Sequence, residues 1–124
     1  MLKTILIIAS AGAIGSVLRF FTSLLINKFW SNHFPLATFL TNVIGCFLVG
    51  YFFGILDKLQ LTDSDLKGLL ITGFCGGFTT FSAFGLESVN LFQNQNLSIA
   101  VLYIGLSITL GLLAVSYGLF VAKM

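Results

Sequence analysis

Two ionisable residues of this chain lie inside long apolar stretches, where a charge is costly. Arg19 interrupts the first of these stretches, and Glu87 lies towards the end of the third. A charged side chain at membrane depth costs about 2.5–3.5 kcal/mol even on the lenient insertion scale, so such residues are candidates for a polar pathway. For Arg19, a role in a pore or vestibule and a role in structural pairing are equally supported, whereas the position of Glu87 favours a structural role.

Uncharged polar side chains recur on one face of two other apolar stretches. Thr38 and Asn42 are four residues apart in the second stretch, and Tyr103 and Ser107 have the same spacing in the fourth. Residues four apart share a helical face, and amide and hydroxyl groups can donate hydrogen bonds to an anion. Asn42 is equally compatible with a bond to a neighbouring helix, worth about 1 kcal/mol or less. The two hydroxyls can also accept from a cation or bond to their own helix.

The stretch from Gly73 to Phe84 combines three glycines, two threonines, a serine and four phenylalanines in the middle of the third apolar stretch. In a bilayer every backbone polar group needs a partner inside the protein, so these helix-weakening residues predict an interruption that lines a cavity or is buried in protein. The positive edges of Phe81 and Phe84 can face a small anion. An aromatic stripe at helical spacing more often serves packing.

The sequence contains no arrangement typical of an enzyme. It has no carboxylate pair, Cys–His pair, phosphate-binding loop or metal-ligand cluster, and His33 stands alone in a polar segment. Cys46 and Cys75 both fall in apolar stretches, where we expect packing between helices rather than a disulfide. Six basic and four acidic residues form no basic patch, which argues against a nucleic-acid partner.

The elements that must position these residues are four membrane-spanning helices. The chain is 57% hydrophobic and 8% charged, with a mean hydropathy of +1.05, which is outside the range of soluble domains. A bilayer core of about 30 Å needs about 20 helical residues. The predicted spans cover residues 4–26, 36–56, 66–91 and 99–122, and residues 1–124 are expected to form one domain.

Several local features refine this prediction. Pro35 is placed to start the second helix, and Thr62 is the expected N-cap of the third, with acidic residues in the first turn. Pairs of glycines four apart, at 50 and 54 and at 73 and 77, predict closely packed helices. Four lysines fall at one end of the bundle and Lys28 at the other, which favours cytoplasmic termini. Because this bias rests on a few lysines, insertion in both directions stays open.

Three motifs make the chain similar to a known family, the small bacterial fluoride channels of the Fluc (CrcB) type. They are GAIGSVLR at residues 12–19, TFLTNVIG at residues 38–45 and GFCGGFTTFS at residues 73–82. The resemblance covers essentially the whole chain. It implies an all-α membrane protein of four transmembrane helices with a broken third helix, assembled as an antiparallel, dual-topology homodimer with two pores.

The resemblance also implies roles for individual residues. Backbone carbonyls of Gly76 and Thr79 from both subunits would hold a structural Na⁺ at the dimer centre. The implied pore residues are Asn42, Phe81, Phe84, Tyr103 and Ser107. The implied vestibule residues are Arg19, Thr38 and Glu87. Two positions depart from the family pattern, Ala83 and Gly111, and each removes a hydroxyl from the neighbourhood of the pore.

The function implied is a passive, fluoride-selective channel of the bacterial inner membrane that lowers cytoplasmic fluoride. Fluoride is small and tightly hydrated, so a pore must replace its water with several hydrogen-bond donors. It must also avoid a single charged site that would bind the ion too tightly for release. A dual-topology multidrug exporter is the first alternative, but it needs an acidic coupling residue, usually in its first helix, where this chain has Arg19. A non-transporting membrane assembly subunit is the second.

Overall fold

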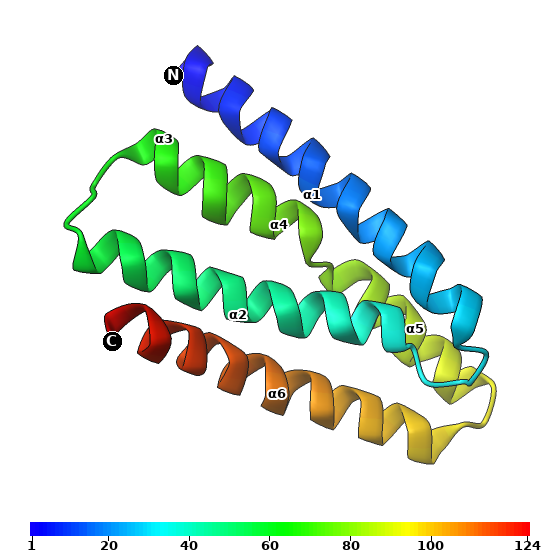
Figure 1. Cartoon of the computed structure of the whole chain (residues 1–124). Coiled ribbons are helices and arrows are strands. Elements are labelled where there is room, and N and C mark those ends of the chain that lie inside the picture. Colours follow the sequence, from blue (N-terminus) through cyan, green and yellow to red (C-terminus); the bar gives the residue numbers. More distant parts are fainter.

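The computed structural model describes residues 1–124 and is entirely helical (Figure 1). Three spans are uninterrupted: α1 (Leu2–Phe29), α2 (Leu36–Lys58) and α6 (Leu97–Lys123). The third span is composed of α3 (Ser64–Lys67), the π-helix η1 (Gly68–Cys75), α4 (Gly76–Phe78) and α5 (Phe81–Gln93). All four spans are long and apolar enough to cross a membrane, which confirms the predicted four-span, all-helical fold.

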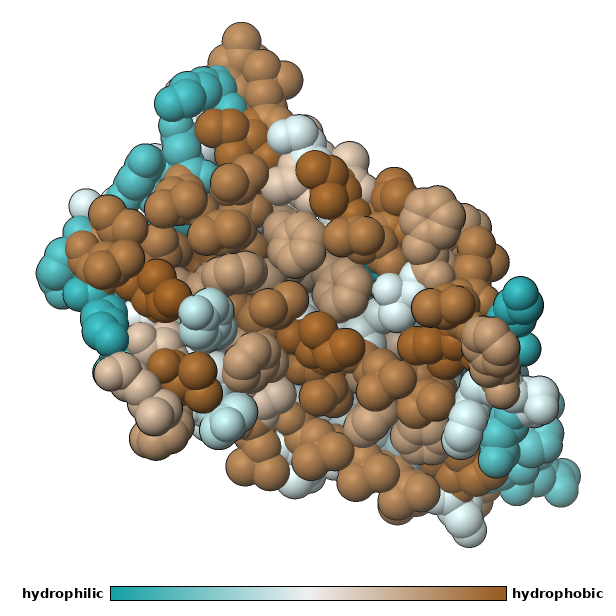
Figure 2. Space-filling view, in the orientation of Figure 1, coloured by the Kyte–Doolittle hydropathy of each residue, from teal (hydrophilic) through white to brown (hydrophobic).

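The surface of the bundle is suited to lipid or to another copy rather than to water. Hydrophobic side chains cover its middle, and hydrophilic residues gather at the two ends (Figure 2). Only 20 of the 124 residues are buried in the single chain, and many large apolar side chains are exposed. A bilayer accounts for this inverted pattern, because exposed apolar surface costs nothing against lipid tails.

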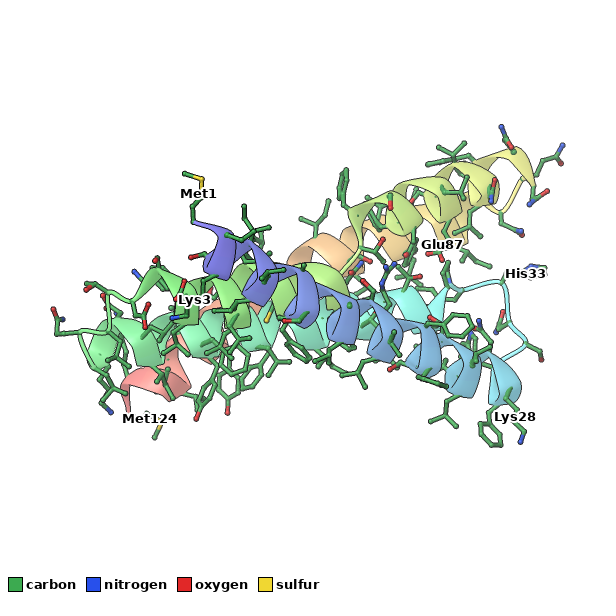
Figure 3. All side chains as sticks on the ribbon, turned by 90° about the horizontal axis from the view of Figure 1, so that it is seen from above. Met1, Lys3, Lys28, His33, Glu87 and Met124 are labelled. Carbon is green, nitrogen blue, oxygen red and sulfur yellow. The ribbon has the colours of Figure 1, made fainter.

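Both termini lie at the same end of the bundle, together with the connection between α2 and α3 (Figure 1). Figure 3 shows Lys3 and Met124 at this end and Lys28 at the opposite one. Two ion pairs close the terminal end: Lys3 Nζ lies 2.8 Å from the Asp65 carboxylate, and Lys123 Nζ lies 3.4 Å from that of Asp57. These pairs link α1 to α3 and α6 to α2 at this end of the bundle.

The third span bends at Thr79 and Thr80, the only two residues between α4 and α5. Both have extended backbone, with φ/ψ of −83°/158° for Thr79 and −150°/115° for Thr80. The predicted interruption therefore exists, but it is narrower than the glycine-rich stretch suggests. Gly73, Gly76 and Gly77 are all helical.

The helices pack as two layers, with α2 against α6 and α1 against η1 and α4. The α2–α6 contact is close because it is built on glycine. A Cβ atom on Gly50 would overlap the Val115 carbonyl oxygen, and one on Gly118 would overlap that of Phe47. Gly54 also faces α6, and Gly73 and Gly77 face α1, as the spacing of the glycine pairs predicts.

One predicted helix start is wrong. Helix α2 begins directly after Pro35, as expected. The cap of the third span, however, is Asp63 rather than Thr62, because the Asp63 carboxylate accepts the Asp65 backbone N–H at 2.9 Å. A carboxylate at this position also interacts favourably with the positive end of the helix dipole.

Candidate functional site

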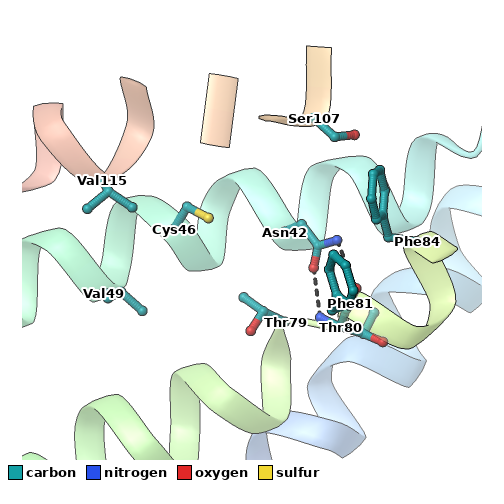
Figure 4. Close-up of a pocket in the computed structure, with 9 residues that line it drawn as sticks. All are labelled: Asn42, Cys46, Val49, Thr79, Thr80, Phe81, Phe84, Ser107 and Val115. Atoms are coloured by element: carbon teal, nitrogen blue, oxygen red, sulfur yellow. Dashed lines mark hydrogen bonds between the residues drawn. The ribbon is translucent and has the colours of Figure 1, made fainter. Parts of the chain in front are cut away.

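Asn42 anchors the bend in the third span. Its side-chain Nδ2 donates to the Thr80 carbonyl oxygen at 3.0 Å, and its Oδ1 accepts the Thr80 backbone N–H at 2.7 Å (Figure 4). One amide thus pairs both backbone groups that the extended conformation frees. One Nδ2 hydrogen remains available, since an amide nitrogen carries two. Asn42 is therefore a structural clamp with a single remaining donor.

Other backbone carbonyls around the bend accept hydrogen bonds from side chains of α1 and of the third span itself. The Gly77 carbonyl oxygen accepts from Arg19 Nε at 3.2 Å and from the Ser16 hydroxyl at 3.5 Å. The Thr79 hydroxyl donates to the Cys75 carbonyl oxygen at 2.9 Å. Arg19 thus places a positive charge at the C-terminal end of α4, where the helix dipole is negative. The Thr79 carbonyl oxygen accepts none of these bonds.

A cavity of about 290 Å³, here called the inner cavity, opens beside the bend (Figure 4). Its walls come from α2, the bend, α5 and α6. The rings of Phe81 and Phe84 lie 5.7 Å apart between centroids, and Phe81 is 84% exposed in the single chain. The lining residues are Asn42, Cys46, Val49, Thr79, Thr80, Phe81, Phe84, Ser107 and Val115.

The Ser107 hydroxyl is a polar group without a hydrogen-bond partner in the lining of the inner cavity. Its hydroxyl oxygen is buried and forms no hydrogen bond. A buried hydroxyl left unpaired costs free energy, about 1–3 kcal/mol for such groups. A ligand that accepts a hydrogen bond would remove that cost, so Ser107 is a candidate donor to an anion or a water in a cavity whose walls are otherwise mainly apolar.

A second cavity of about 290 Å³, here called the vestibule, is mainly polar. It brings together all three predicted vestibule residues, and Thr80 lines both cavities, so the two meet at the bend. The lining residues are Arg19, Ser23, Asn27, Pro35, Ala37, Thr38, Thr41, Thr80, Ala83 and Glu87.

Glu87 connects three helices across the vestibule wall. Its Oε1 accepts from the Thr38 hydroxyl at 2.7 Å, and its Oε2 accepts from the Tyr103 hydroxyl at 2.8 Å. Tyr103 is fully buried and lines neither cavity. It packs behind Phe84, with the two ring centroids 5.3 Å apart. The structure therefore places Tyr103 one layer behind the lining residues with which the family resemblance grouped it.

Thr80 is the main site residue that was not predicted from the sequence. It is the N-cap of α5, because its hydroxyl accepts the Ala83 N–H at 3.2 Å, and it borders both cavities. A threonine directly before an apolar helical run is a recognisable N-cap signal. Cys46 was not predicted as a lining residue either, since a cysteine in an apolar stretch gives no such signal.

Backbone oxygens are the candidate ligands for a cation. Gly76 is exposed in the single chain, and a Cβ atom built on it would meet only the Ile71 carbonyl oxygen, at 3.8 Å. The Thr79 carbonyl oxygen accepts no backbone hydrogen bond. Hard cations prefer such oxygen ligands. The backbone oxygens of these two residues are therefore the candidate cation ligands of the chain.

Comparison with known proteins identifies relatives over nearly the whole chain. The family model described as "CrcB-like protein, Camphor Resistance (CrcB)" matches residues 6–119. A protein of Flavobacterium psychrophilum is 53% identical over 122 residues, covering 98% of each chain. One of Azobacteroides pseudotrichonymphae is 49% identical, covering 95% of this chain and 94% of its own, and one of Rhizobium etli is 41% identical with the same coverage. All three are named fluoride-specific ion channel FluC.

Proposed function

Because this chain belongs to the CrcB/FluC family, we propose that it is a passive, fluoride-selective channel of the bacterial inner membrane that releases fluoride from the cytoplasm. The observation that carries the proposal is the inner cavity. It places an unpaired hydroxyl, an amide donor and two aromatic rings next to a bend in a membrane-spanning helix. The same cavity lacks a basic side chain, which would hold an anion too tightly for conduction.

The two cavities suggest successive steps for the ion. In the vestibule, Arg19 supplies positive potential, and the Ser23 hydroxyl and the Asn27 amide replace part of the hydration shell. In the inner cavity, the remaining Asn42 hydrogen and the Ser107 hydroxyl donate, while Phe81 and Phe84 offer positive ring edges. Glu87 is occupied by Thr38 and Tyr103, so it fixes the wall rather than binding the ion. Many weak donors favour both binding and release.

The exposed inner cavity leads us to propose that the working unit is an antiparallel homodimer. Phe81 is 84% exposed in the single chain, so a second copy is needed to close the pathway around it. The Gly76 and Thr79 carbonyls of both copies would then hold a Na⁺ at the dimer centre, where the ion supplies positive charge between the two pores.

Na⁺ is therefore expected to raise the melting temperature of the purified dimer in detergent, relative to K⁺ at the same ionic strength. A ligand that binds only the folded assembly stabilises it in proportion to the logarithm of its concentration once the site is near saturation. Light scattering should report the mass of two chains throughout. Equal melting temperatures in the two salts would count against a sodium site.

Ion efflux from liposomes that contain only the purified protein tests the function directly. Rapid release of fluoride with no release of chloride is expected. Replacing Phe81 or Phe84 by isoleucine should lower fluoride efflux by on the order of tenfold or more, because isoleucine keeps an apolar side chain but has no positive ring edge. The dimer should remain folded in both variants.

Phe92→Ile is the matched control, since Phe92 lies on the same helix α5 and lines neither cavity. Its fluoride efflux should equal that of the unmodified protein. Wild-type efflux in both the Phe81 and Phe84 variants would refute the role of the rings. Absence of fluoride release from folded wild-type protein would refute the channel itself.

A further inference from the structure

Cys46 lies in the wall of the inner cavity, one helical turn after Asn42 on α2. Its side chain is half-buried, and its Sγ lies close to Gly111 of α6. A Cβ atom built on Gly111 would lie 3.6 Å from Cys46 Sγ, which is ordinary van der Waals contact. The thiol therefore covers the space that the missing side chain of Gly111 leaves open.

The thiol is partly exposed, and several polar groups line the cavity beside it. Ser107, one turn before Gly111 on α6, has a buried hydroxyl without a partner in the same cavity. Asn42, Thr79 and Thr80 add further polar groups to the lining. A buried water needs two to four polar partners, and the cavity volume of about 290 Å³ exceeds the space of a single water many times.

We infer that Cys46 is a thiol-modification site inside the ion pathway, reached by small water-soluble electrophiles, and that its modification blocks permeation. This inference rests on the proposed channel function, since it places the thiol beside the route of the ion. The other cysteine differs sharply, because Cys75 is fully buried in η1 and lines neither cavity.

The reaction with a methanethiosulfonate reagent is a thiol exchange. The thiol gives its proton to water, and the thiolate attacks the sulfenyl sulfur of the reagent. A mixed disulfide forms on Sγ as the sulfur–sulfur bond of the reagent breaks, and methanesulfinate leaves. A thiol reductant reverses the modification. The attached group would lie in the inner cavity beside Ser107 and narrow it.

The test uses the full-length protein in liposomes treated with methanethiosulfonate ethylammonium. Intact mass should show one adduct per chain, and peptide mapping should place it on Cys46. Fluoride efflux should fall by on the order of tenfold and return after reduction with dithiothreitol. Each variant is compared with its own untreated sample, so a change in basal efflux does not affect the comparison.

Three variants test whether modification of Cys46 alone causes the block. Cys46→Ala should gain no adduct and should be insensitive to the reagent, whereas Cys75→Ala should respond as the wild-type protein does. Gly111→Val should slow labelling of Cys46, because its side chain would meet Sγ.

Failure of the inference and failure of the channel proposal give different results. Absence of labelling at Cys46 in the folded protein, or full labelling without loss of efflux, would overturn the inference. A protein that conducts no fluoride before treatment would refute the channel, and a labelled Cys46 with an unlabelled Cys75 would still support the accessibility of the thiol.

Discussion

Replacement of Asn42 by leucine is expected to abolish fluoride efflux and to lower the free energy of unfolding by about 2–4 kcal/mol. Leucine has a similar size but cannot pair with Thr80, whose N–H and carbonyl both depend on the Asn42 amide. Each buried polar group left unpaired costs about 1–3 kcal/mol, and the bilayer offers no water in exchange. The bend would relax, and Phe81 and Phe84, which follow it directly, would move. Denaturant titration in detergent and efflux from liposomes measure the two effects.

Two further variants show which part of the amide matters. Asn42→Asp keeps an acceptor for the Thr80 N–H but loses the donor to the Thr80 carbonyl, so its stability should lie between those of wild type and Asn42→Leu. Its efflux should also be low, because it adds a negative charge to the inner cavity. Thr22→Ala serves as the control, since its exposed hydroxyl bonds only to Leu18 of its own helix. Normal efflux in Asn42→Leu would show that the clamp is dispensable.

The four spans were predictable because they depend on length and hydropathy alone. The predicted limits differ from the observed ones by only two or three residues at most ends, as at 4–26 against Leu2–Phe29. The position of the bend was also visible in composition. Its narrow extent was not, since glycine weakens a helix on average but serves equally well where two helices approach closely. Gly73 and Gly77 lie where the third span approaches α1 closely.

The structure brings most of the predicted site residues together, whereas their contacts could not be predicted. Asn42, Phe81, Phe84 and Ser107 do share one cavity, and the three predicted vestibule residues share another. The partner of Asn42 was not predictable, because a side-chain amide carries both donors and acceptors and the sequence does not say which backbone group lies opposite.

The phenylalanines of the third span show a related limit of periodicity. At 74, 78, 81 and 84 they read as one helical stripe. In the structure Phe74 stacks on Phe78, with centroids 6.1 Å apart, and Phe81 pairs separately with Phe84. The bend divides the stripe, and the π-helix before it changes the angle between successive residues. A constant helical angle cannot describe a span of this kind.

Gly77→Ala is expected to lower the free energy of unfolding by about 1–3 kcal/mol and to reduce fluoride efflux strongly. A Cβ atom on Gly77 would overlap the Gly12 carbonyl oxygen and would lie 3.0 Å from Gly12 Cα. Both atoms belong to the backbone of α1, so no side chain can move aside. Helix α1 would have to shift, and the bond from Arg19 Nε to the Gly77 carbonyl would weaken with it. Denaturant titration and liposome efflux again provide the measurements.

Gly85→Ala and Gly105→Ala are the matched controls, because a Cβ atom on either glycine meets nothing within 4 Å in the chain. Alanine restricts the unfolded chain more than glycine does, so at these helical positions it should stabilise the protein by about 0.4–1 kcal/mol. Gly→Ala is thus expected to lower the free energy of unfolding at Gly77, where a neighbouring backbone approaches closely, and to raise it at Gly85 and Gly105, where none does. Loss of stability in all three variants would point to a general intolerance of alanine and against the specific contact between α4 and α1.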